Sequence, residues 1–315
     1  MPNANPTILR LGTRGSLLAR TQSGIVAKAL EHAHPGLRIE LVTFKTSGDQ
    51  ISERPLHEFG GKGLFTKELE LALIDGQIDF AVHSYKDMPT TMPLVEQSGL
   101  IVAAVPARED PRDVLVANRP MVIADLPSGA RVGTGSLRRR CQLLTLRPDL
   151  QIEPIRGNID TRLRKQREGQ FDAAVMAMAG IRRAGLFDPA TMRPIEVDVL
   201  IPAPAQGALA LQCRRDDDRT QRLLEALSDP ITAACVAAER ALVAALNGDC
   251  LSPIAALATI SSGQITLKAA VGGRGGKPPV LHATAQADAS SPETAAQEAY
   301  SILARQNVNA LLHGP

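Results

Sequence analysis

Residues 80–89 read FAVHSYKDMP, and this stretch decides which fold we expect. Its apolar start, Phe80–Val82, is typical of a buried strand, and a polar loop that ends at Pro89 follows at once. Such a strand and loop belong in an open α/β sheet, in which the loops after the strands carry the chemistry. Asp87 lies in this loop beside Lys86, so its carboxylate is a candidate proton donor or stabiliser of a cation. Ordinary solvated loop charges would give the same pattern.

The segments before this stretch alternate between two periodicities. We expect strands at Thr7–Leu11 and Leu37–Phe44 and helices at Leu17–Glu31 and Leu64–Ile74. The glycine-rich residues Gly12–Ser16 are expected to form a tight loop. Alternating strands and helices predict a mostly parallel sheet with helices on both faces.

Two blocks of sequence occur twice, in the same order. GTRGSL at 12–17 resembles GTGSL at 133–137, and in both copies an arginine follows the serine by four positions and a glutamine by six. GQIDFAV at 76–82 resembles GQFDAAV at 169–175. The shared order predicts two lobes with one topology.

The first repeated block has a physical meaning, because each copy places a serine where a helix should begin. Ser16 and Ser136 are therefore expected N-caps. A helix N-terminus presents free N–H groups and partial positive charge, so each block is a candidate carboxylate or phosphate site. Arg14, Arg138 and Arg139 would add donors that grip a carboxylate with two hydrogen bonds. Simple helix capping would explain the serines equally well.

The net charge of +2 hides a basic segment in the middle of the chain. Between Arg131 and Arg167 there are ten lysines or arginines and three acidic residues. Within it, Arg156–Arg162 follows the apolar segment Leu150–Ile155 and forms a third basic junction between a strand and a helix. This surplus favours a polyanionic partner, although a basic helix can also be merely solvated.

The pattern changes after residue 200. LIPAPAQGALALQ, at 200–212, is expected to carry the chain back to the first lobe. Asp229 and Pro230 predict the start of a long helix that runs to Leu246, with Gly248 as its C-terminal glycine. A small α+β domain should follow, built from two alternating segments and a final helix, at 255–260, 264–271 and 292–306.

Composition excludes several classes of protein. A chain of 315 residues with 44% hydrophobic residues fits a globular protein of two or three domains. No apolar run approaches the roughly 18–20 residues of a membrane helix, and the first residues do not read as a secretory signal, so a cytoplasmic location is expected. Nucleotide-binding glycine motifs, CxxC pairs and HExxH are absent from the sequence, so we expect no metal.

The blocks together resemble the porphobilinogen deaminase family almost from end to end. The matching blocks are GTRGSLLAR (12–20), GGKGLFTKELE (60–70), DFAVHSYKDMP (79–89), REDPRD (108–113), GTGSLRRRCQL (133–143), RGNIDTRL (156–163), MAGIRRAGL (178–186), PAQGALALQC (204–213) and AAERAL…GDC (237–250). The resemblance implies an enzyme of tetrapyrrole biosynthesis that joins four porphobilinogen molecules head to tail into hydroxymethylbilane and releases ammonia at each step.

The resemblance also implies a fold and a division of the chain. The expected fold is α/β, with two similar doubly wound lobes like those of type II periplasmic binding proteins and a small α+β C-terminal domain. Residues 1–105 with 202–225 would form lobe 1 with the catalytic loop, 106–201 the arginine-rich lobe 2, and 226–315 the C-terminal domain with the cofactor cysteine. A monomer that binds neither nucleic acid nor membrane is implied.

Residue roles follow from the same resemblance. The catalytic aspartate falls on Asp87, and a covalent dipyrromethane cofactor would be joined by a thioether to Cys250. Residues that would hold the acetate and propionate groups of substrate and cofactor fall on Arg14, Ser16, Lys62, Ser84, Lys86, Thr134, Ser136, Arg138, Arg139, Arg156, Gly157, Arg162, Arg183 and Gln206.

Two positions depart from the family pattern. Asp249 precedes Cys250, where the family usually has a small residue, and puts a negative charge beside the expected cofactor. Ala205-Gln206-Gly207 replaces the usual Gly-Gln-Gly, which suggests a modest backbone change.

Two other functions are compatible with parts of the sequence. A non-catalytic anion-binding protein with two lobes would need the arginines but neither Asp87 nor Cys250. A nucleic-acid binder could use Arg138–Arg140 and Arg162–Arg167. Against it, the chain has no Trp, two Tyr and six Phe, so aromatic side chains on which bases could stack are scarce.

Overall fold

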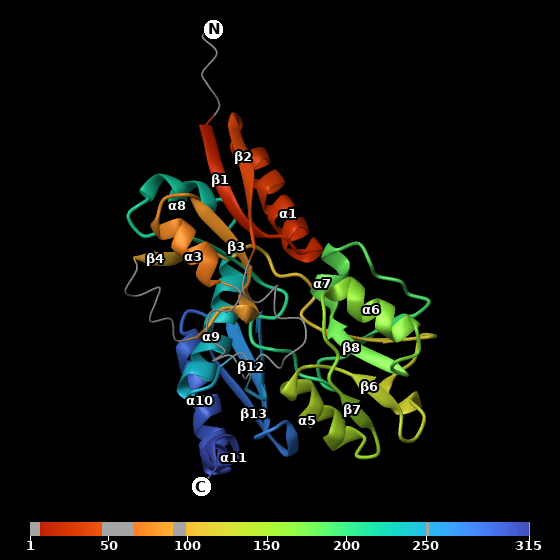
Figure 1. Cartoon of the computed structure of the whole chain (residues 1–315). Coiled ribbons are helices and arrows are strands. Elements are labelled where there is room, and N and C mark those ends of the chain that lie inside the picture. The colour runs from red at the N-terminus through yellow and green to blue at the C-terminus, as the bar shows by residue number, and fades with distance from the viewer. Residues whose placement is uncertain (1–6, 46–65, 91–98, 250–251, 315) are drawn as a thin grey trace. The chain divides into compact units, whose positions relative to one another are not determined.

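The computed structural model describes residues 7–45, 66–90, 99–249 and 252–314 (Figure 1). The chain divides into two compact units. Unit 1 consists of Met1–Arg108 and Ala208–Ala233, and unit 2 of Glu109–Gly207 and Ala234–Pro315. The lobe 2 sheet and the C-terminal residues thus belong to one unit, while the finer division into three domains stays a prediction.

Unit 1 is built on a five-stranded sheet in the order β2-β1-β3-β10-β4. Its strands are β1 (Thr7–Arg14), β2 (Leu37–Phe44), β3 (Phe80–Ser84), β4 (Leu100–Ala104) and β10 (Leu209–Arg214). β1 runs parallel to β2 and β3, and β10 runs antiparallel to β3 and β4. Since β10 lies beside β3, the chain does return to the first lobe as the sequence predicted.

The helices of unit 1 are α1 (Leu17–Ala33), α3 (Lys67–Ile74), the short 3-10 turn η2 (Tyr85–Asp87) and α8 (Asp218–Glu225). The buried side chains of α1 and α3 belong to separate hydrophobic clusters, and successive residues of β3 alternate between these clusters. The two helices therefore cover opposite faces of the sheet, as alternating strand residues require.

The second sheet has the order β7-β6-β8-β5-β9. Its strands are β5 (Asp113–Ala117), β6 (Arg131–Gly133), β7 (Gln151–Glu153), β8 (Ala173–Ala177) and β9 (Met192–Ile195). The helices are η3 (Ile123–Asp125), α5 (Leu137–Leu146), α6 (Ile159–Arg167) and α7 (Met178–Arg183). β6 is parallel to β7 and β8, and β5 is antiparallel to β8 and β9, which repeats the pattern of unit 1.

The repeat extends to individual hydrogen bonds. In the first sheet the N–H of Arg10 donates to the carboxylate of Asp79 over 2.7 Å, and in the second the N–H of Arg131 donates to Asp172 over 2.7 Å. Both aspartates belong to the second repeated sequence block. The prediction of two lobes with one topology is confirmed.

One local expectation was wrong at the end of β1. Residues 12–14 continue the strand, in register with β2, instead of forming a loop. Gly12 is needed there for close packing, because a Cβ at this position would overlap Cδ1 of Ile78. Its lack of a side chain, which resembled a turn signal in the sequence, serves the approach of two buried segments.

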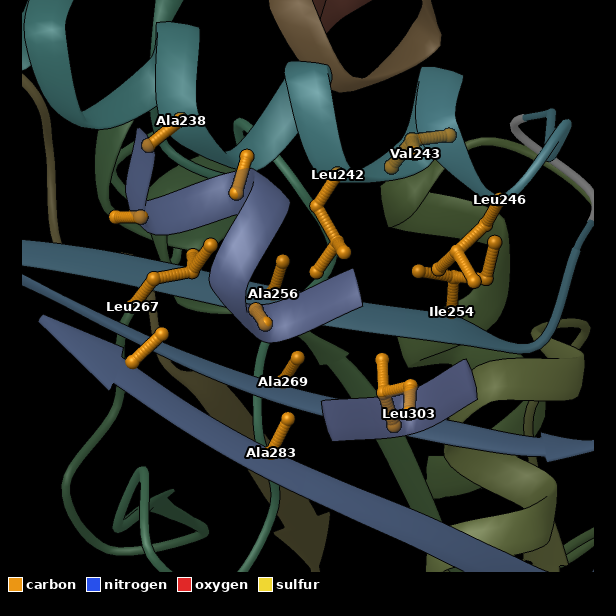
Figure 2. Close-up of a cluster of buried hydrophobic side chains, with 14 of the residues drawn as sticks. Ala238, Leu242, Val243, Leu246, Ile254, Ala256, Leu267, Ala269, Ala283 and Leu303 are labelled. Atoms are coloured by element: carbon orange, nitrogen blue, oxygen red, sulfur yellow. The ribbon is translucent and has the colours of Figure 1, made fainter. Parts of the chain in front are cut away.

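The C-terminal residues form a three-stranded antiparallel sheet covered by helices. The strands are β11 (Ile254–Ser261), β12 (Gln264–Gly273) and β13 (Lys277–Asp288), and the helices are α9 (Pro230–Ala245), α10 (Pro292–Arg305) and α11 (Val308–His313). Figure 2 shows Leu242 of α9, Leu246 directly after α9, Leu303 of α10 and Leu267 of β12 in one buried cluster. Small residues such as Ala269 let the helices approach the sheet closely.

Two details of this region differ from expectation. β13 was not predicted, because its second and third residues, Pro278 and Pro279, argue against a strand. It lies at the edge of the sheet, where a missing N–H is tolerated. The left-handed residue that ends α9 is Asn247, with φ 50°, and Gly248 follows it because a Cβ there would overlap Ile254.

Across the described residues, none of the helices has the length and apolar character to cross a membrane.

Candidate functional site

The first group of predicted site residues lies at the carboxyl edge of the unit 1 sheet. β1 and β3 are adjacent and parallel, so both end at this edge. Arg14 is the last residue of β1, Ser84 is the last of β3, and Asp87 follows in η2. Asp87 is exposed, whereas Arg14 and Ser84 are partly buried. The exposed carboxylate is free of the sheet and accessible to a small molecule.

Hydrogen bonds tie this edge to helix α1. Ser16 caps the helix, as predicted, by accepting from the N–H of Ala19 over 3.3 Å. The hydroxyl of Ser84 donates to Oε1 of Gln22 over 3.2 Å, and Gln22 is itself buried. The glutamine that follows the capping serine by six positions thus connects helix α1 to the end of β3.

A buried polar trio lies behind Ser84. Nε2 of His83 is 2.9 Å from Oε1 of Gln212, whose amide nitrogen lies 3.5 Å from Oε1 of Glu70. Because that amide donates to Glu70, its oxygen accepts from His83, which places the ring proton on Nε2. Burial lowers the pKa of His83 to about 4, so the ring is neutral at neutral pH. Burial also raises the pKa of Glu70.

The second group of predicted residues follows β6 in unit 2. Ser136 caps α5 by accepting from the N–H of Arg139, again as predicted. Thr134 is buried, and its hydroxyl accepts from the N–H of Ser136 over 3.3 Å. The first turn of α5, which follows this junction, carries two buried arginines, Arg138 and Arg139.

The two arginines share one carboxylate. Asp113, at the start of β5, is fully buried; its Oδ2 accepts from Nη1 of Arg138 over 2.7 Å and its Oδ1 from Nη2 of Arg139 over 2.8 Å. Burial alone would raise the pKa of Asp113, but the two guanidinium groups outweigh it and hold that pKa well below its ordinary value.

One positive charge of this trio is not balanced by Asp113. Burial lowers the pKa of Arg138, because the loss of hydration outweighs the attraction of Asp113. Among the described residues, no hydrogen-bond partner is found for the buried Nε of Arg138. A buried donor on a surplus cation is costly unless an anion meets it. The trio therefore favours a carboxylate ligand.

Further predicted residues lie at two other strand ends of unit 2. At the junction after β7, Gly157 has φ +107°, and a Cβ on it would crowd Thr161. Nε of Arg162 donates to the carbonyl of Gly157 over 2.7 Å, and Arg156 is partly buried beside it. After β8, Arg183 of α7 donates to the carbonyl of Gly207 over 2.7 Å. Because β6, β7 and β8 are parallel, these junctions share one edge of the sheet.

Gln206 is buried against Asp113. Its amide donates to Oδ1 of Asp113 over 2.8 Å and to the carbonyl of Pro111 over 2.7 Å. The preceding Ala205 has φ +59°, a left-handed conformation that glycine favours, so this departure from the family pattern places an alanine in a strained conformation. The carboxylate of Glu239 accepts the N–H of Ala205 over 2.6 Å and so supports the strained turn.

Two predicted residues, Lys62 and Cys250, lie outside the described residues. Next to the latter, the carboxylate of Asp249 accepts from the hydroxyl of Ser252 over 2.9 Å, and the same hydroxyl accepts from the N–H of Asp249. Asp249 and Ser252 are thus tied to each other by two hydrogen bonds.

Comparison with known proteins decides the family. Residues 9–222 match the family model "Porphobilinogen deaminase, dipyromethane cofactor binding domain", and residues 233–303 match "Porphobilinogen deaminase, C-terminal domain". The chain belongs to the porphobilinogen deaminase family.

Relatives named porphobilinogen deaminase agree over most of the chain. One from Roseiflexus sp. is 49% identical over 269 residues, covering 85% of this chain and 87% of the relative. One from Syntrophotalea carbinolica is 47% identical over 297 residues, covering 94% and 93%. Among solved structures, immunogenic lipoprotein A from Vibrio vulnificus has a TM-score of 0.43 and 14% identity, covering 73% of this chain and 99% of that one.

The residues present fit the cofactor group that the family model names. The acetate and propionate side chains expected from the resemblance would find guanidinium groups and a helix N-terminus at the unit 2 edge. The sequence had not singled out Asp113 or His83, although both lie in blocks that match the porphobilinogen deaminase family. Their signal was a charged or polar residue within an apolar strand.

Proposed function

We propose that the chain is a hydroxymethylbilane synthase. It joins four porphobilinogen molecules head to tail, one ammonia leaving for each, and it builds on a dipyrromethane group held by a thioether to Cys250. The observation that carries this proposal is the buried trio of Asp113, Arg138 and Arg139, whose surplus positive charge suits a ligand rich in carboxylates.

The arginines bind and orient. Each porphobilinogen carries two carboxylates, so each addition brings more negative charge to be held. Arg138, Arg139 and the N-terminus of α5 hold the first pyrrole carboxylates, and Arg156, Arg162 and Arg183 extend the row of donors. When bound, the dipyrromethane group supplies the pyrrole carbon to which the first substrate is joined.

Asp87 does the proton chemistry. The amine of the substrate leaves from its protonated form: when the bond between the methylene carbon and the ammonium nitrogen breaks, nitrogen keeps the electron pair and departs as ammonia, and the carbon becomes cationic. The carboxylate of Asp87 stabilises that positive charge. After the new carbon–carbon bond forms, the attacked pyrrole carbon loses its proton, and Asp87 accepts it. The exposed position of Asp87 at a strand end allows this approach.

The family match does not decide oligomeric state, location or nucleic-acid binding. For these we propose a monomer that acts in the cytoplasm and binds no nucleic acid. In this proposal the positive charge near α5 binds the carboxylates of a small molecule. The chain also has few aromatic side chains on which nucleic-acid bases could stack.

The intact mass of the purified protein tests the proposal. We expect the mass of the chain plus one covalent dipyrrole, and further steps of one pyrrole unit after brief exposure to porphobilinogen. Cys250→Ala should remove the attached mass. Cys213→Ala is the matched control, because burial raises the pKa of that thiol to about 12 and leaves it unreactive. An unmodified wild-type mass, or a dipyrrole still bound to Cys250→Ala, contradicts the proposal.

A further inference from the structure

The buried trio of unit 2 is not a requirement of the fold. Aligning Ser16 with Ser136 places Leu18 and Ala19 where lobe 2 has Arg138 and Arg139. Strand pairing places Leu209 opposite Ser84, the last residue of β3, just as Asp113 lies opposite Ala177, the last residue of β8. The equivalent positions of lobe 1 are therefore Leu18, Ala19 and Leu209. Lobe 1 thus forms the same topology with uncharged residues at these three positions.

Asp113 fixes both guanidinium groups in direction. Its Oδ1 accepts from Nε and Nη2 of Arg139, over 3.2 and 2.8 Å, so one edge of that guanidinium is held in its plane. Its Oδ2 accepts from Nη1 of Arg138, and the same nitrogen also donates to the carbonyl of Ile201 over 2.8 Å. Nη1 of Arg139 donates to the carbonyl of Val175 over 2.9 Å. Neither guanidinium can turn without breaking a buried hydrogen bond.

Asp113 is held in turn. Gln206 donates to its Oδ1, and the strained turn at Ala205 that places Gln206 is supported by the carboxylate of Glu239. A carboxylate that is fully buried and hydrogen-bonded on both oxygens is a rigid reference point. Its one negative charge leaves one of the two cations for a ligand.

We propose that Asp113 is a positioning residue, which aims Arg138 and Arg139 so that together they bind one carboxylate of a pyrrole ligand. The inference rests on the proposed function only for the identity of that ligand. Asp113 itself touches no ligand and moves no proton.

Two substitutions separate position from charge. Asp113→Asn removes the charge and one of the two acceptor oxygens, and Asp113→Glu keeps the charge but displaces the carboxylate by one methylene. Since a misplacement of about 1 Å can cost roughly a hundredfold in rate, both should lower kcat/KM for porphobilinogen by about that factor. Both should also lower the fraction of purified protein that carries the covalent pyrrole mass. Asp149→Asn, at an exposed pair with Arg147 at the far end of α5, is the matched control and should match wild type.

The Asp113→Glu variant can overturn the proposal. If Asp113→Glu keeps wild-type kcat/KM and wild-type pyrrole mass, the location of the carboxylate does not matter, and Asp113 only neutralises charge. If it loses both while its melting temperature stays near wild type, the positioning role is supported.

A measurement on the wild-type holoenzyme covers the case in which neither variant folds. In protein labelled with ¹⁵N-arginine, Nε–H of Arg139 should exchange with water at least about a hundredfold more slowly than that of exposed arginines, because opening requires breaking the buried pair. Arg139→Lys assigns the signal. Exchange as fast as at exposed arginines would show that Asp113 holds nothing in place. This readout needs no turnover, so a protein that makes no tetrapyrrole yet shows a protected Arg139 contradicts the proposed function and not the role of Asp113.

Discussion

The two lobes share one framework but bury their polar groups on opposite faces of it. On the face that α3 covers, lobe 1 has the polar trio of His83, Gln212 and Glu70. Lobe 2 has apolar residues at the equivalent positions, which are Met176, Val116 and Leu163 in the same order. On the other face the situation is reversed, since lobe 2 has the charged trio and lobe 1 has Leu18, Ala19 and Leu209.

This difference teaches that the framework accepts either kind of core. What the lobes keep in common is the set of groups that define the strand and helix ends: the capping serines, the buried glutamines and the two aspartates that bind strand N–H groups. We expect the groups that the lobes do not share to carry the function. The exposed acid is also unshared, because the position equivalent to Asp87 is Gly180 in lobe 2.

The largest expected effect concerns this unshared acid. Asp87→Ala should lower turnover by about 10²–10⁴-fold, the usual range for loss of a proton-transferring group. Its melting temperature should stay at the wild-type value, because an exposed loop carboxylate is removed. Steady-state kinetics and thermal unfolding measure both. Asp75→Ala, an exposed acid at the end of α3, is the control; near-normal turnover of Asp87→Ala would refute the assignment.

The next prediction tests whether Leu18, Ala19 and Leu209 of lobe 1 are equivalent to the charged trio of lobe 2. Leu209→Asp creates a buried carboxylate where positions 18 and 19 supply no guanidinium, so unfolding in urea should show a loss of about 3–5 kcal/mol. Adding Leu18→Arg and Ala19→Arg supplies the two cations of lobe 2 and should restore part of the loss. If the single variant is as stable as wild type, the equivalence of the two sites is wrong.

The polar trio of lobe 1 predicts a dependence of stability on pH. His83 has a folded pKa of about 4 and an ordinary value of 6.5, so its contribution is complete above pH 6.5 and is lost as the pH falls toward 4. Between about pH 7 and 5 the free energy of unfolding should fall by about 2 kcal/mol on this account.

Urea unfolding at both pH values measures this fall. His83→Met, which gives lobe 1 the residue of lobe 2, should flatten it, while the exposed His32→Met should not. An unchanged slope in His83→Met would show that other groups cause the acid sensitivity.

The smallest effects sharpen the comparison of equivalent glycines. Gly12→Ala would drive a Cβ into the fully buried Ile78, and we expect a cost of about 2 kcal/mol. At Gly133 the nearest atoms belong to Phe171, 3.1 Å from the added Cβ, so Gly133→Ala should cost about half as much. Gly24→Ala, in open space on α1, should instead stabilise by about 0.5–1 kcal/mol. Equal losses at Gly12 and Gly133 would contradict this ranking.

Much of this architecture was predictable because it depends on local patterns. β2 and the N-caps at Ser16 and Ser136 agree with expectation residue for residue, since alternation and capping are read from adjacent positions. Gly12 was misread, because only the packed structure shows that a glycine serves close contact. Edge strand β13 was missed for a similar reason, since its place in the sheet is what allows its prolines.

The site divides in the same way. The residues of the repeated blocks, such as Arg138 and Arg139, were found because they follow a recognisable glycine and serine pattern. Asp113 was not, because its importance depends on a pairing with α5, 25 residues away, which local sequence does not encode. The predicted ligand-binding roles stay predictions.

The path of the chain through the sheets bears on how the protein is made. The second sheet is complete within residues 113–195, but the first lacks β10, which lies between β3 and β4, until residue 214 has been synthesised. On the ribosome the lobe encoded first therefore finishes last, and the facing edges of β3 and β4 stay unpaired until β10 emerges. Such edges invite misassembly, so a chain that stalls before residue 209 should be a preferred client of chaperones.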